Sequence, residues 1–437
     1  MAKPNLAYIP ATIGDKVYSI LPNDSVGDFD FDRADGSSPT GVTRINAQGL
    51  IETVASGENR LNYSLLDGEV VGCPHLLLEP ARTNLVQYSE DFSNGYWIKT
   101  RTTVSANNII SPDGTLNADK IIETTDTGLH AVSETFTVVS GVSHTVSVFI
   151  KKGTNEFVQI LFGTNDVTNN PYVNFDVNQG VFENNGTTSV DVKYFGNGWY
   201  RCSSTVTTAS TSLTYFISSI QSISDSRASS FSGNVNNNIY LYGAMLEEGS
   251  YPTSYIKTNS GSATTRAAET CNNSGNAATF NDSEGVLMAE IAALVDDQTR
   301  RHISVSDGST ENVVRFHYND NASNSIRFQI RSNNSIEASV SFSVNDIKEF
   351  HKVAIHYKLN DVKFFIDGFY VGTDTNATMP IGLSVLQFNQ GNGGAKFLGK
   401  TKQIQYFDSV LADTQLEELT SWDSFRAMAE GQLYTIE

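Results

Sequence analysis

The chain has 437 residues, of which 39% are hydrophobic, and its 29 lysines and arginines stand against 48 aspartates and glutamates, for a formal net charge of -19. This length predicts two or three domains with sizeable cores. A surface this acidic repels phosphate backbones and anionic lipids, which argues against nucleic acid and membranes as partners. The three cysteines, Cys73, Cys202 and Cys271, have no metal-binding spacing, so neither a disulfide framework nor a zinc site is expected.

The start of the chain, residues 1–10, lacks the apolar core of a secretory signal. Nowhere does an uninterrupted apolar run reach the length needed to cross a bilayer. We therefore expect the chain to be made and folded in a cytoplasm.

Short alternating runs characterise residues 1–88, which we expect to form an irregular β-rich region. In Asp28-Phe-Asp-Phe-Asp32 the phenylalanines would point to one side and the carboxylates to the other, as in half of a sheet. A calcium-binding EF-hand loop does not fit this run, because Arg33 stands where the glycine must turn and Pro39 where the bidentate glutamate belongs. The acidic run is therefore interpreted as a charged strand edge, which discourages aggregation.

The segment 76–84 reads Leu-Leu-Leu-Glu-Pro-Ala-Arg-Thr-Asn, an apolar run that ends at a proline and is followed by a polar strand and turn. It contains a Glu-Pro-x-Arg-Thr-Asn signature and closely resembles structural proteins of tailed bacteriophages, in which this signature joins an N-terminal strand region to a β-sandwich. The runs 43–46 and 59–63 resemble the stretch that precedes the signature in those proteins. The signature residues are Glu79, Pro80, Arg82, Thr83 and Asn84.

Residues 89–257 repeat short strands rich in Val, Ile, Phe, Thr and Tyr between Gly, Asn and Ser turns, which is typical of a β-sandwich. The pair Asn197-Gly198 predicts a tight hairpin, because both central residues of a type I′ turn need positive φ. The run 241–256 resembles the closing strand of carbohydrate-binding-module-like jelly rolls found in phage appendages. We expect such a jelly roll here, followed at residues 258–280 by a polar linker or crossing segment.

Residues 281–437 alternate as half-buried antiparallel strands should, for example at 313–318 and 351–357. A hairpin is predicted around Asp367 and Gly368, and with the strands that follow it resembles the laminin G-like or concanavalin A-like sandwich. One helix is predicted over 414–430, with an apolar stripe that packs on the sandwich or on a neighbouring subunit. Thr414 and Glu417 have the spacing of a capping box. The expected fold class is thus all-β: two antiparallel β-sandwich (jelly-roll) domains, an irregular β-rich N-terminal region and one C-terminal helix.

Sugar recognition needs a flat aromatic face for the apolar side of the ring and amide or carboxylate groups for the hydroxyls. Tyr96 and Trp97 have this composition, and so does the run Tyr318, Asn319 and Asp320. The same pattern is also typical of aromatic residues packed in a core or at its rim. These five residues are the candidate ligand-binding positions, with the packing interpretation as the alternative.

No nucleophile with its base, glycine-rich phosphate loop or metal-binding histidine pair is evident in the sequence. His351 and His356 lie five positions apart on one expected strand and therefore face opposite sides. Paired carboxylates for glycoside hydrolysis would show only in space. We expect no enzyme, no catalytic or metal-ligating residues and no cofactor. Laminin G-like domains often hold calcium at the rim, so calcium there stays an option, although its ligands cannot be matched residue by residue in this sequence.

The resemblances together imply a structural protein of a phage virion, a head or tail fibre or appendage, that attaches to host-surface glycans through its sandwiches. Residues 1–88 would be its docking region, which binds the particle or sister subunits. Its expected location is the virion, assembled in the host cytoplasm. Its expected partners are other virion proteins, such as capsid or tail subunits, and further copies of itself, since virions are symmetric assemblies. Two alternatives stay open: a decoration protein that stabilises capsid or tail without binding a ligand, and a capsule-degrading glycosidase.

Overall fold

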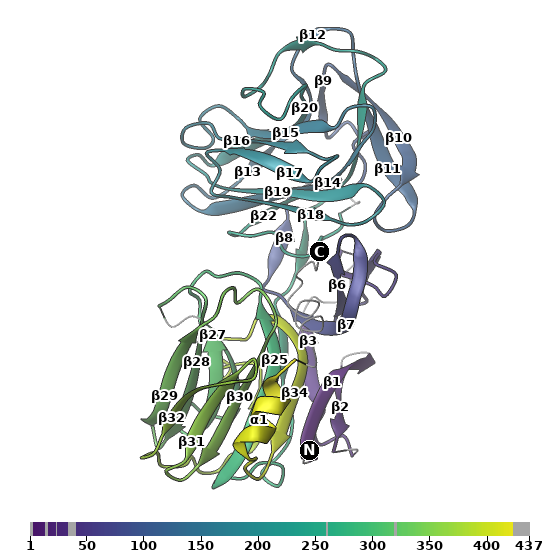
Figure 1. Cartoon of the computed structure of the whole chain (residues 1–437). Helices are drawn as coiled ribbons and strands as arrows, with labels where there is room; N and C mark the ends of the chain where they lie inside the picture. Colours follow the sequence, from purple (N-terminus) through teal and green to yellow (C-terminus); the bar gives the residue numbers. More distant parts are fainter. Residues whose placement is uncertain are drawn as a thin grey trace.

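The computed structural model describes residues 3–13, 16–22, 24–33, 41–258, 261–318 and 321–422. Over these ranges the chain consists of 34 β-strands and one short helix, which confirms the expected all-β class. The strands build two sandwiches, one above the other in Figure 1, with N-terminal strands running along the side of the lower one and up to the junction. Within the described ranges no helix has the length and apolar character of a membrane span.

The upper sandwich is a jelly roll made of two six-stranded antiparallel sheets. Apolar side chains from both sheets meet in one core, as the alternating pattern of residues 89–257 predicts. The first sheet has the order β10 (Thr102–Ile110), β11 (Leu116–Glu123), β22 (Asn238–Glu248), β14 (Ser143–Lys152), β19 (Trp199–Thr207), β18 (Ser189–Tyr194). The second has the order β17 (Val181–Asn185), β16 (Tyr172–Asp176), β15 (Phe157–Phe162), β20 (Ser212–Ser219), β13 (His130–Thr137), β9 (Ile98–Thr100). A small pair, β12 (Thr127–Gly128) and β21 (Phe231–Ser232), lies beside them.

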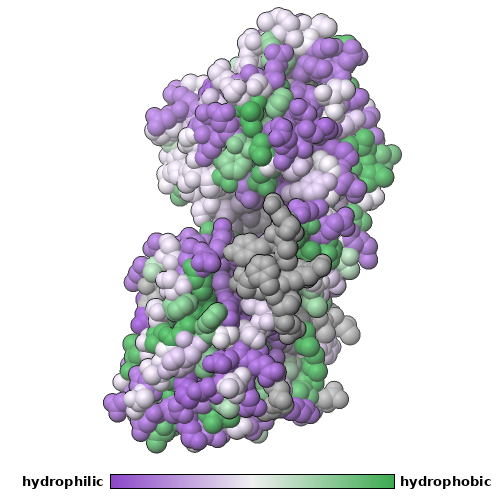
Figure 2. Space-filling model, viewed as in Figure 1, coloured by the Kyte–Doolittle hydropathy of each residue, from purple (hydrophilic) through white to green (hydrophobic). Residues whose placement is uncertain are grey.

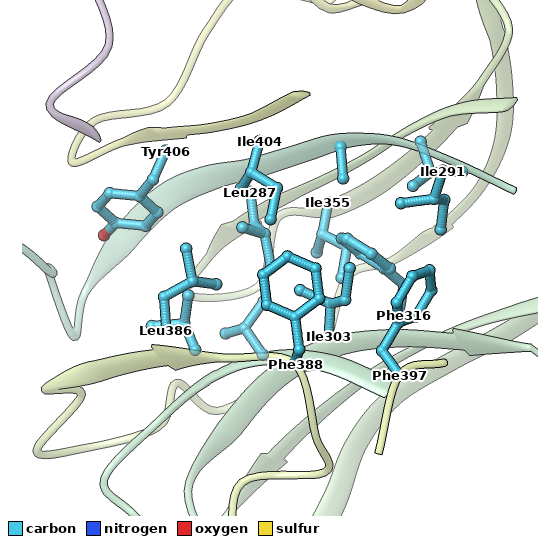
Figure 3. Close-up of a cluster of buried hydrophobic side chains, with 14 of the residues drawn as sticks. Leu287, Ile291, Ile303, Phe316, Ile355, Leu386, Phe388, Phe397, Ile404 and Tyr406 are labelled. Atoms are coloured by element: carbon cyan, nitrogen blue, oxygen red, sulfur yellow. The ribbon is translucent and has the colours of Figure 1, made fainter. Parts of the chain in front are cut away.

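The lower sandwich packs a five-stranded sheet against an 11-stranded one. The smaller sheet has the order β29 (Ser335–Ser343), β28 (Ser325–Ser332), β27 (Val313–Tyr318), β26 (Arg301–Ser306), β33 (Val385–Gln387). The larger contains β25 (Glu284–Ala293), β30 (His351–Lys358), β31 (Val362–Ile366), β32 (Phe369–Asp374) and β34 (Gly399–Phe407). Figure 3 shows the core between them, where Leu287, Ile355 and Ile404 of the large sheet meet Ile303, Phe316 and Leu386 of the small one.

The N-terminal strands complete the large sheet, so that residues distant in sequence share one core. β1 (Leu6–Ile13) pairs with β34, and β2 (Lys16–Leu21), β3 (Phe29–Arg33) and β24 (Glu269–Asn272) continue the sheet outward. On β3 the two phenylalanines are buried while Asp30 and Asp32 are exposed, which confirms the predicted half-sheet. β7 (Glu69–Leu78) also pairs with β34 and carries β6 (Leu61–Leu66) on its other edge.

Short strand pairs connect the two sandwiches. β8 (Arg82–Asn84) pairs with β23 (Thr264–Arg266), and β4 (Thr43–Ile45) pairs with β5 (Ile51–Thr53). The described part of the polar segment 258–280 therefore crosses the junction as β23 and β24, each hydrogen-bonded to a strand that precedes the jelly roll.

Both predicted hairpin turns are confirmed. Asn197 and Gly198 have φ of 51° and 78° between β18 and β19. Asp367 and Gly368 have φ of 50° and 85° between β31 and β32. This left-handed backbone is easiest for glycine, asparagine and aspartate, which explains why the local sequence identifies these turns.

The helix is shorter than predicted. α1 spans Asp413–Thr420, and Ser421 is already extended, with φ of -76° and ψ of 166°. The Thr420 hydroxyl donates back to the carbonyl of Leu416, a local bond that competes with continued helix. The start also differs, because Gln415, in place of the predicted capping box, accepts the backbone N–H of Ala412. Leu416 and Leu419 are buried against the sandwich, as the stripe predicts. Residues 423–430 of the prediction lie outside the described residues.

Candidate functional site at the domain junction

Trp97 is a core residue of the jelly roll and offers no face to a sugar, which corrects the first candidate pair. Its side chain is 1% exposed, its ring stacks on Phe92 at 4.9 Å, and its indole N–H donates to the carbonyl of Tyr88 at 3.0 Å. Tyr96 keeps partial exposure, but its ring packs on Tyr88 and Trp97 and its hydroxyl accepts the N–H of Gln87. The packing interpretation therefore applies to Trp97 fully and to Tyr96 in part.

Tyr318 is likewise inside the lower sandwich. It is 0% exposed, on the same inward face of β27 as Phe316, and its ring lies 5.8 Å from that of Phe397. Strand alternation alone does not determine which face of a strand points inward, and in β27 the face that carries Tyr318 is the inward one. Asn319 and Asp320 lie outside the described residues, so their role in ligand binding stays a prediction.

Glu79 of the signature lies at the centre of a buried ion-pair network at the junction. Its carboxylate pairs with Arg60 Nη1 at 2.8 Å and Arg266 Nη1 at 3.0 Å. The backbone N–H and hydroxyl of Ser254 donate to it at 2.8 and 2.7 Å. Burial alone would raise the pKa of Glu79, but Arg266 and Arg60 together with the Ser254 hydrogen bonds hold it well below its usual range. This carboxylate is therefore ionised at neutral pH.

A second buried carboxylate, Glu269, completes the network. It pairs with Arg60 through both oxygens and with Arg33 Nη1 at 3.2 Å, and it accepts the backbone N–H of Glu79 at 2.8 Å. The side chains of Arg33, Arg60 and Glu269 are all 0% exposed. Charges so deeply buried persist only when they are paired and hydrogen-bonded on all sides, as they are here.

The next two signature residues bind the jelly roll to the crossing segment. The carbonyl of Pro80 accepts a hydrogen bond from Arg266 Nη2 at 3.0 Å. Arg82 Nε lies 3.5 Å from a carboxylate oxygen of Glu247, and its guanidinium lies over the ring of Tyr251 at 5.5 Å. The signature thus supplies contacts to strands on both sides of the junction.

The last two residues of the signature extend these contacts. The hydroxyls of Thr83 and Thr265 are hydrogen-bonded at 2.8 Å across β8 and β23. Asn84 donates from its amide to the carbonyls of Ala244, at 3.2 Å, and Ile256, at 2.8 Å. With 0% exposure, Asn84 holds the final strand of the jelly roll against β8. All five signature residues are therefore structural at this junction.

Beside this network a pocket of about 240 Å³ opens. Its walls come from the N-terminal region, the jelly roll and the lower sandwich, and they mix aromatic, amide and cationic groups. A concave site with a few polar groups between domains is a common place for a ligand. The residues that carry its chemistry are Asn62, Lys193, Phe195, Arg201, Tyr251 and Lys400.

Cations dominate the electrostatics of this junction pocket. Burial lowers the pKa of Lys400 to about 8, and the charge of Lys193 adds to the effect. Burial also lowers the pKa of Lys193, against partial opposition from Asp191. Neither lysine forms an ion pair with a residue in the described ranges. The pocket is therefore suited to negative charge.

Metal chemistry finds no support in the part of the chain that the structure describes, where no three His, Cys, Asp or Glu side chains are grouped to hold an ion. The two histidines of β30 contact different carboxylates. His351 Nδ1 lies 2.6 Å from Asp367, and His356 Nε2 lies 3.3 Å from Asp361. The absence of a cofactor and the option of calcium at the rim remain predictions.

Residues 274–417 match the Laminin_G_3 family model, described as the concanavalin A-like lectin/glucanases superfamily. This match covers the strands β25 to β34 of the lower sandwich and confirms the expected likeness to laminin G-like domains. A search of curated protein sequences finds no match.

Matches to solved structures cover about a third of the chain. A sialidase carbohydrate-binding module of Ruminococcus gnavus, CBM40 with bound α2,3-sialyllactose, is 16% identical over 34% of this chain and 92% of its own, with a TM-score of 0.29. Domain 4 of a Geobacillus stearothermophilus arabinanase is 9% identical over 35% and 73%, with a TM-score of 0.29. A pentraxin of Limulus polyphemus is 10% identical over 33% and 72%, with a TM-score of 0.25. Likeness at this level supports no statement about a ligand.

Sequence reasoning found the signature but missed the pocket cations. Lys193 alternates with Asp191 along β18, a pattern typical of any solvated strand. Lys400 lies near the start of β34, where Lys402 follows two positions later, and nothing in this local sequence indicates a binding site. Only the approach of the two sandwiches brings both lysines to one pocket.

Proposed function

We propose that this protein is a non-enzymatic structural component of a tailed-phage virion, a head or tail fibre or appendage, that attaches to host-surface glycans through the pocket at its domain junction. The observation that carries the proposal is the place of the Glu-Pro-x-Arg-Thr-Asn segment. The segment that resembles phage structural proteins builds the buried network that holds the two sandwiches together, and the polar and aromatic pocket opens beside it.

The composition of the pocket favours a saccharide as ligand. The ring of Phe195 and the ring of Tyr251 supply apolar faces, and the ammonium groups of Lys193 and Lys400 supply donors to hydroxyls. The match of residues 274–417 to a lectin and glucanase superfamily supports the same class of ligand. The face of the molecule in Figure 2 is mainly hydrophilic with scattered apolar residues, a surface suited to polar partners.

The pocket is proposed to bind and not to cleave. Its two carboxylates are Glu79 and Asp191. Glu79 is held ionised by two arginines, so it has no proton to donate to a leaving group. Asp191 is exposed and has no neighbouring acid on this wall to complete a catalytic pair.

Binding of the full chain to a glycan array tests the attachment role. We expect binding that is lost in Tyr251→Ala and kept in Tyr370→Ala, a tyrosine that is 49% exposed on β32 away from the pocket. Equal binding by both variants, or by neither, contradicts the assignment of the pocket.

Antibody labelling of intact virions tests the proposed location on the particle. Labelling together with a blank glycan array would favour the decoration protein. Release of reducing sugar from host capsule would favour the glycosidase. A protein found only in solution, with no label on particles, contradicts the virion role.

A further inference from the structure

We infer that the junction pocket receives a carboxylate-bearing sugar residue, held between Lys193 of the jelly roll and Lys400 of the lower sandwich. This inference rests on the proposed function, glycan binding, and names the chemical class of the glycan. The two lysines reach the pocket from different sandwiches, and neither forms an ion pair with a carboxylate in the described ranges.

The first observation is that the two lysines come from opposite sides of the pocket. Lys193 lies on β18 directly across from Arg201 of β19, so these two cations share a face of the jelly-roll sheet. Lys400 lies on β34 across from Leu77 of β7, in the large sheet of the lower sandwich. Lys193 and Arg201 thus belong to the jelly roll, whereas Lys400 and Leu77 belong to the large sheet of the lower sandwich. All four residues line the pocket.

The second observation is that neither lysine forms an ion pair with a carboxylate in the described ranges, although the charges of Asp191 and Glu79 act on them from a greater distance. Other half-buried lysines of the junction do have partners: Lys257 lies 2.7 Å from Glu90, and Lys402 lies 3.5 Å from Glu290. Lys193 and Lys400 have none among the described residues. In a chain with 48 acidic residues against 29 basic ones, two lysines left together without an ion-paired carboxylate favour an external anion.

The buried carboxylate of the pocket, Glu79, acts on Lys400 through its charge but is already engaged by other groups. Glu79 lines the pocket, but both of its oxygens are engaged by Ser254, and Arg60 and Arg266 already pair with it. Arg201 adds a further unmet donor, because its buried Nε has no hydrogen-bond partner. A bound carboxylate would accept from the lysines and reduce the repulsion between them.

The size and remaining walls of the pocket favour one acidic sugar residue at the end of a chain. Its volume of about 240 Å³ is below the roughly 300–1,000 Å³ of sites for drug-sized ligands. Phe195 lies beside Lys193, with the ammonium 5.7 Å from its ring, so an apolar face adjoins the charge. This pairing of ring and cation is what an acidic sugar needs and what a free phosphate does not use.

Calorimetric titration of the full chain at pH 7 tests the inference. The probes are a glucuronate-terminated oligosaccharide, sialyllactose, a neutral oligosaccharide of equal length and inorganic phosphate. The variants are Lys193→Gln and Lys400→Gln, and the control is Lys396→Gln, an exposed lysine of the same sandwich that does not line the pocket. We expect tighter binding of an acidic than of the neutral sugar. Each pocket variant should weaken binding of the acidic sugar by about tenfold or more, because each removes a charge-assisted hydrogen bond. The control variant should bind the acidic sugar as tightly as the wild-type protein.

Thermal unfolding without ligand separates a binding defect from a folding defect. Because Lys193 and Lys400 repel each other when the pocket is empty, their glutamine variants should melt at or above the temperature of the wild-type protein. Loss of binding together with a lowered melting temperature in both variants would contradict the inference.

The remaining outcomes distinguish the inference from the function on which it rests. Binding of the neutral sugar as tightly as the acidic ones overturns the inference and leaves glycan attachment in place. Displacement of the acidic sugar by inorganic phosphate at equal concentration also overturns it, because the site would then recognise charge alone. If no saccharide binds at all, both the inference and the proposed function are contradicted.

Discussion

Replacing Glu269 with glutamine should destabilise the protein far more than removing a surface carboxylate, because Glu269 is the buried counter-charge of two arginines. Its side chain is 0% exposed, as are those of Arg33 and Arg60. Glutamine keeps the size but removes the charge, and its NH₂ group cannot accept from the arginine that now faces it. The two guanidinium groups would remain buried with an incomplete set of acceptors.

The expected loss follows from the energetics of buried pairs. Removing one partner of a buried ion pair costs about 3–5 kcal/mol, which lowers the folding equilibrium constant by roughly 10² to 10⁴. A whole domain has only about 5–15 kcal/mol of stability. The variant should therefore be strongly destabilised at the junction, where Glu269 also accepts the N–H of Glu79.

Urea unfolding measures this loss, followed in parallel by tryptophan fluorescence and far-ultraviolet circular dichroism. Two probes are needed because two sandwiches need not unfold as one unit. The control is Glu284→Gln, which removes a single ion pair with Lys358 at 2.7 Å, with side chains 26% and 49% exposed. That pair should contribute about 0–1 kcal/mol. If the two variants unfold at the same urea concentration, the network does not stabilise the junction and the reasoning is refuted.

Three further predictions concern single sites. Trp97→Ala should cost about 3–5 kcal/mol in chemical denaturation by opening a cavity in the jelly-roll core, whereas Tyr96→Ala should cost less; equal losses would contradict the assignment of Trp97 to the core. Gly368→Ala should lower stability by about 1 kcal/mol, because φ is 85° and a Cβ would lie 3.1 Å from the Cβ of Ser421. An unchanged melting temperature would contradict the left-handed conformation of Gly368 in this turn. Asp367→Asn should weaken the protein more at pH 5 than at pH 8. Burial lowers the pKa of its partner His351, but the hydrogen bond to Asp367 outweighs burial and raises that pKa overall. A histidine with a raised pKa stabilises the fold below about pH 6.5, and this stabilisation is lost as the pH rises through the folded-state pKa. A pH-independent difference in the free energy of unfolding would show that the histidine is not charged there.

Local sequence was sufficient for features that depend on a few consecutive residues. The hairpins at Asn197-Gly198 and Asp367-Gly368 follow from backbone conformations that few residue types adopt. The buried and exposed faces of β3 follow from strict alternation along the strand. In contrast, the periodic apolar stripe did not predict that the helix ends at Thr420, where the side-chain hydroxyl donates to the carbonyl of Leu416.

The signature was located by its resemblance, but its chemistry depends on partners that the local pattern does not identify. Glu79 acquires its role from Ser254, near the end of the jelly-roll region, and from Arg266, which follows that region in the chain. Even the large sheet is shared, since β1 pairs with β34 near the other end of the sequence.

What the amino-acid sequence determined by itself was the all-β class, the tight turns and the likeness of the C-terminal sandwich to laminin G-like domains. Only the tertiary structure decided that Trp97 and Tyr318 face inward and that Lys193 meets Lys400 at one pocket. The physical reason is that turn and strand preferences act between neighbours in the chain, whereas burial and electrostatic environment are set by whatever the fold packs alongside each residue.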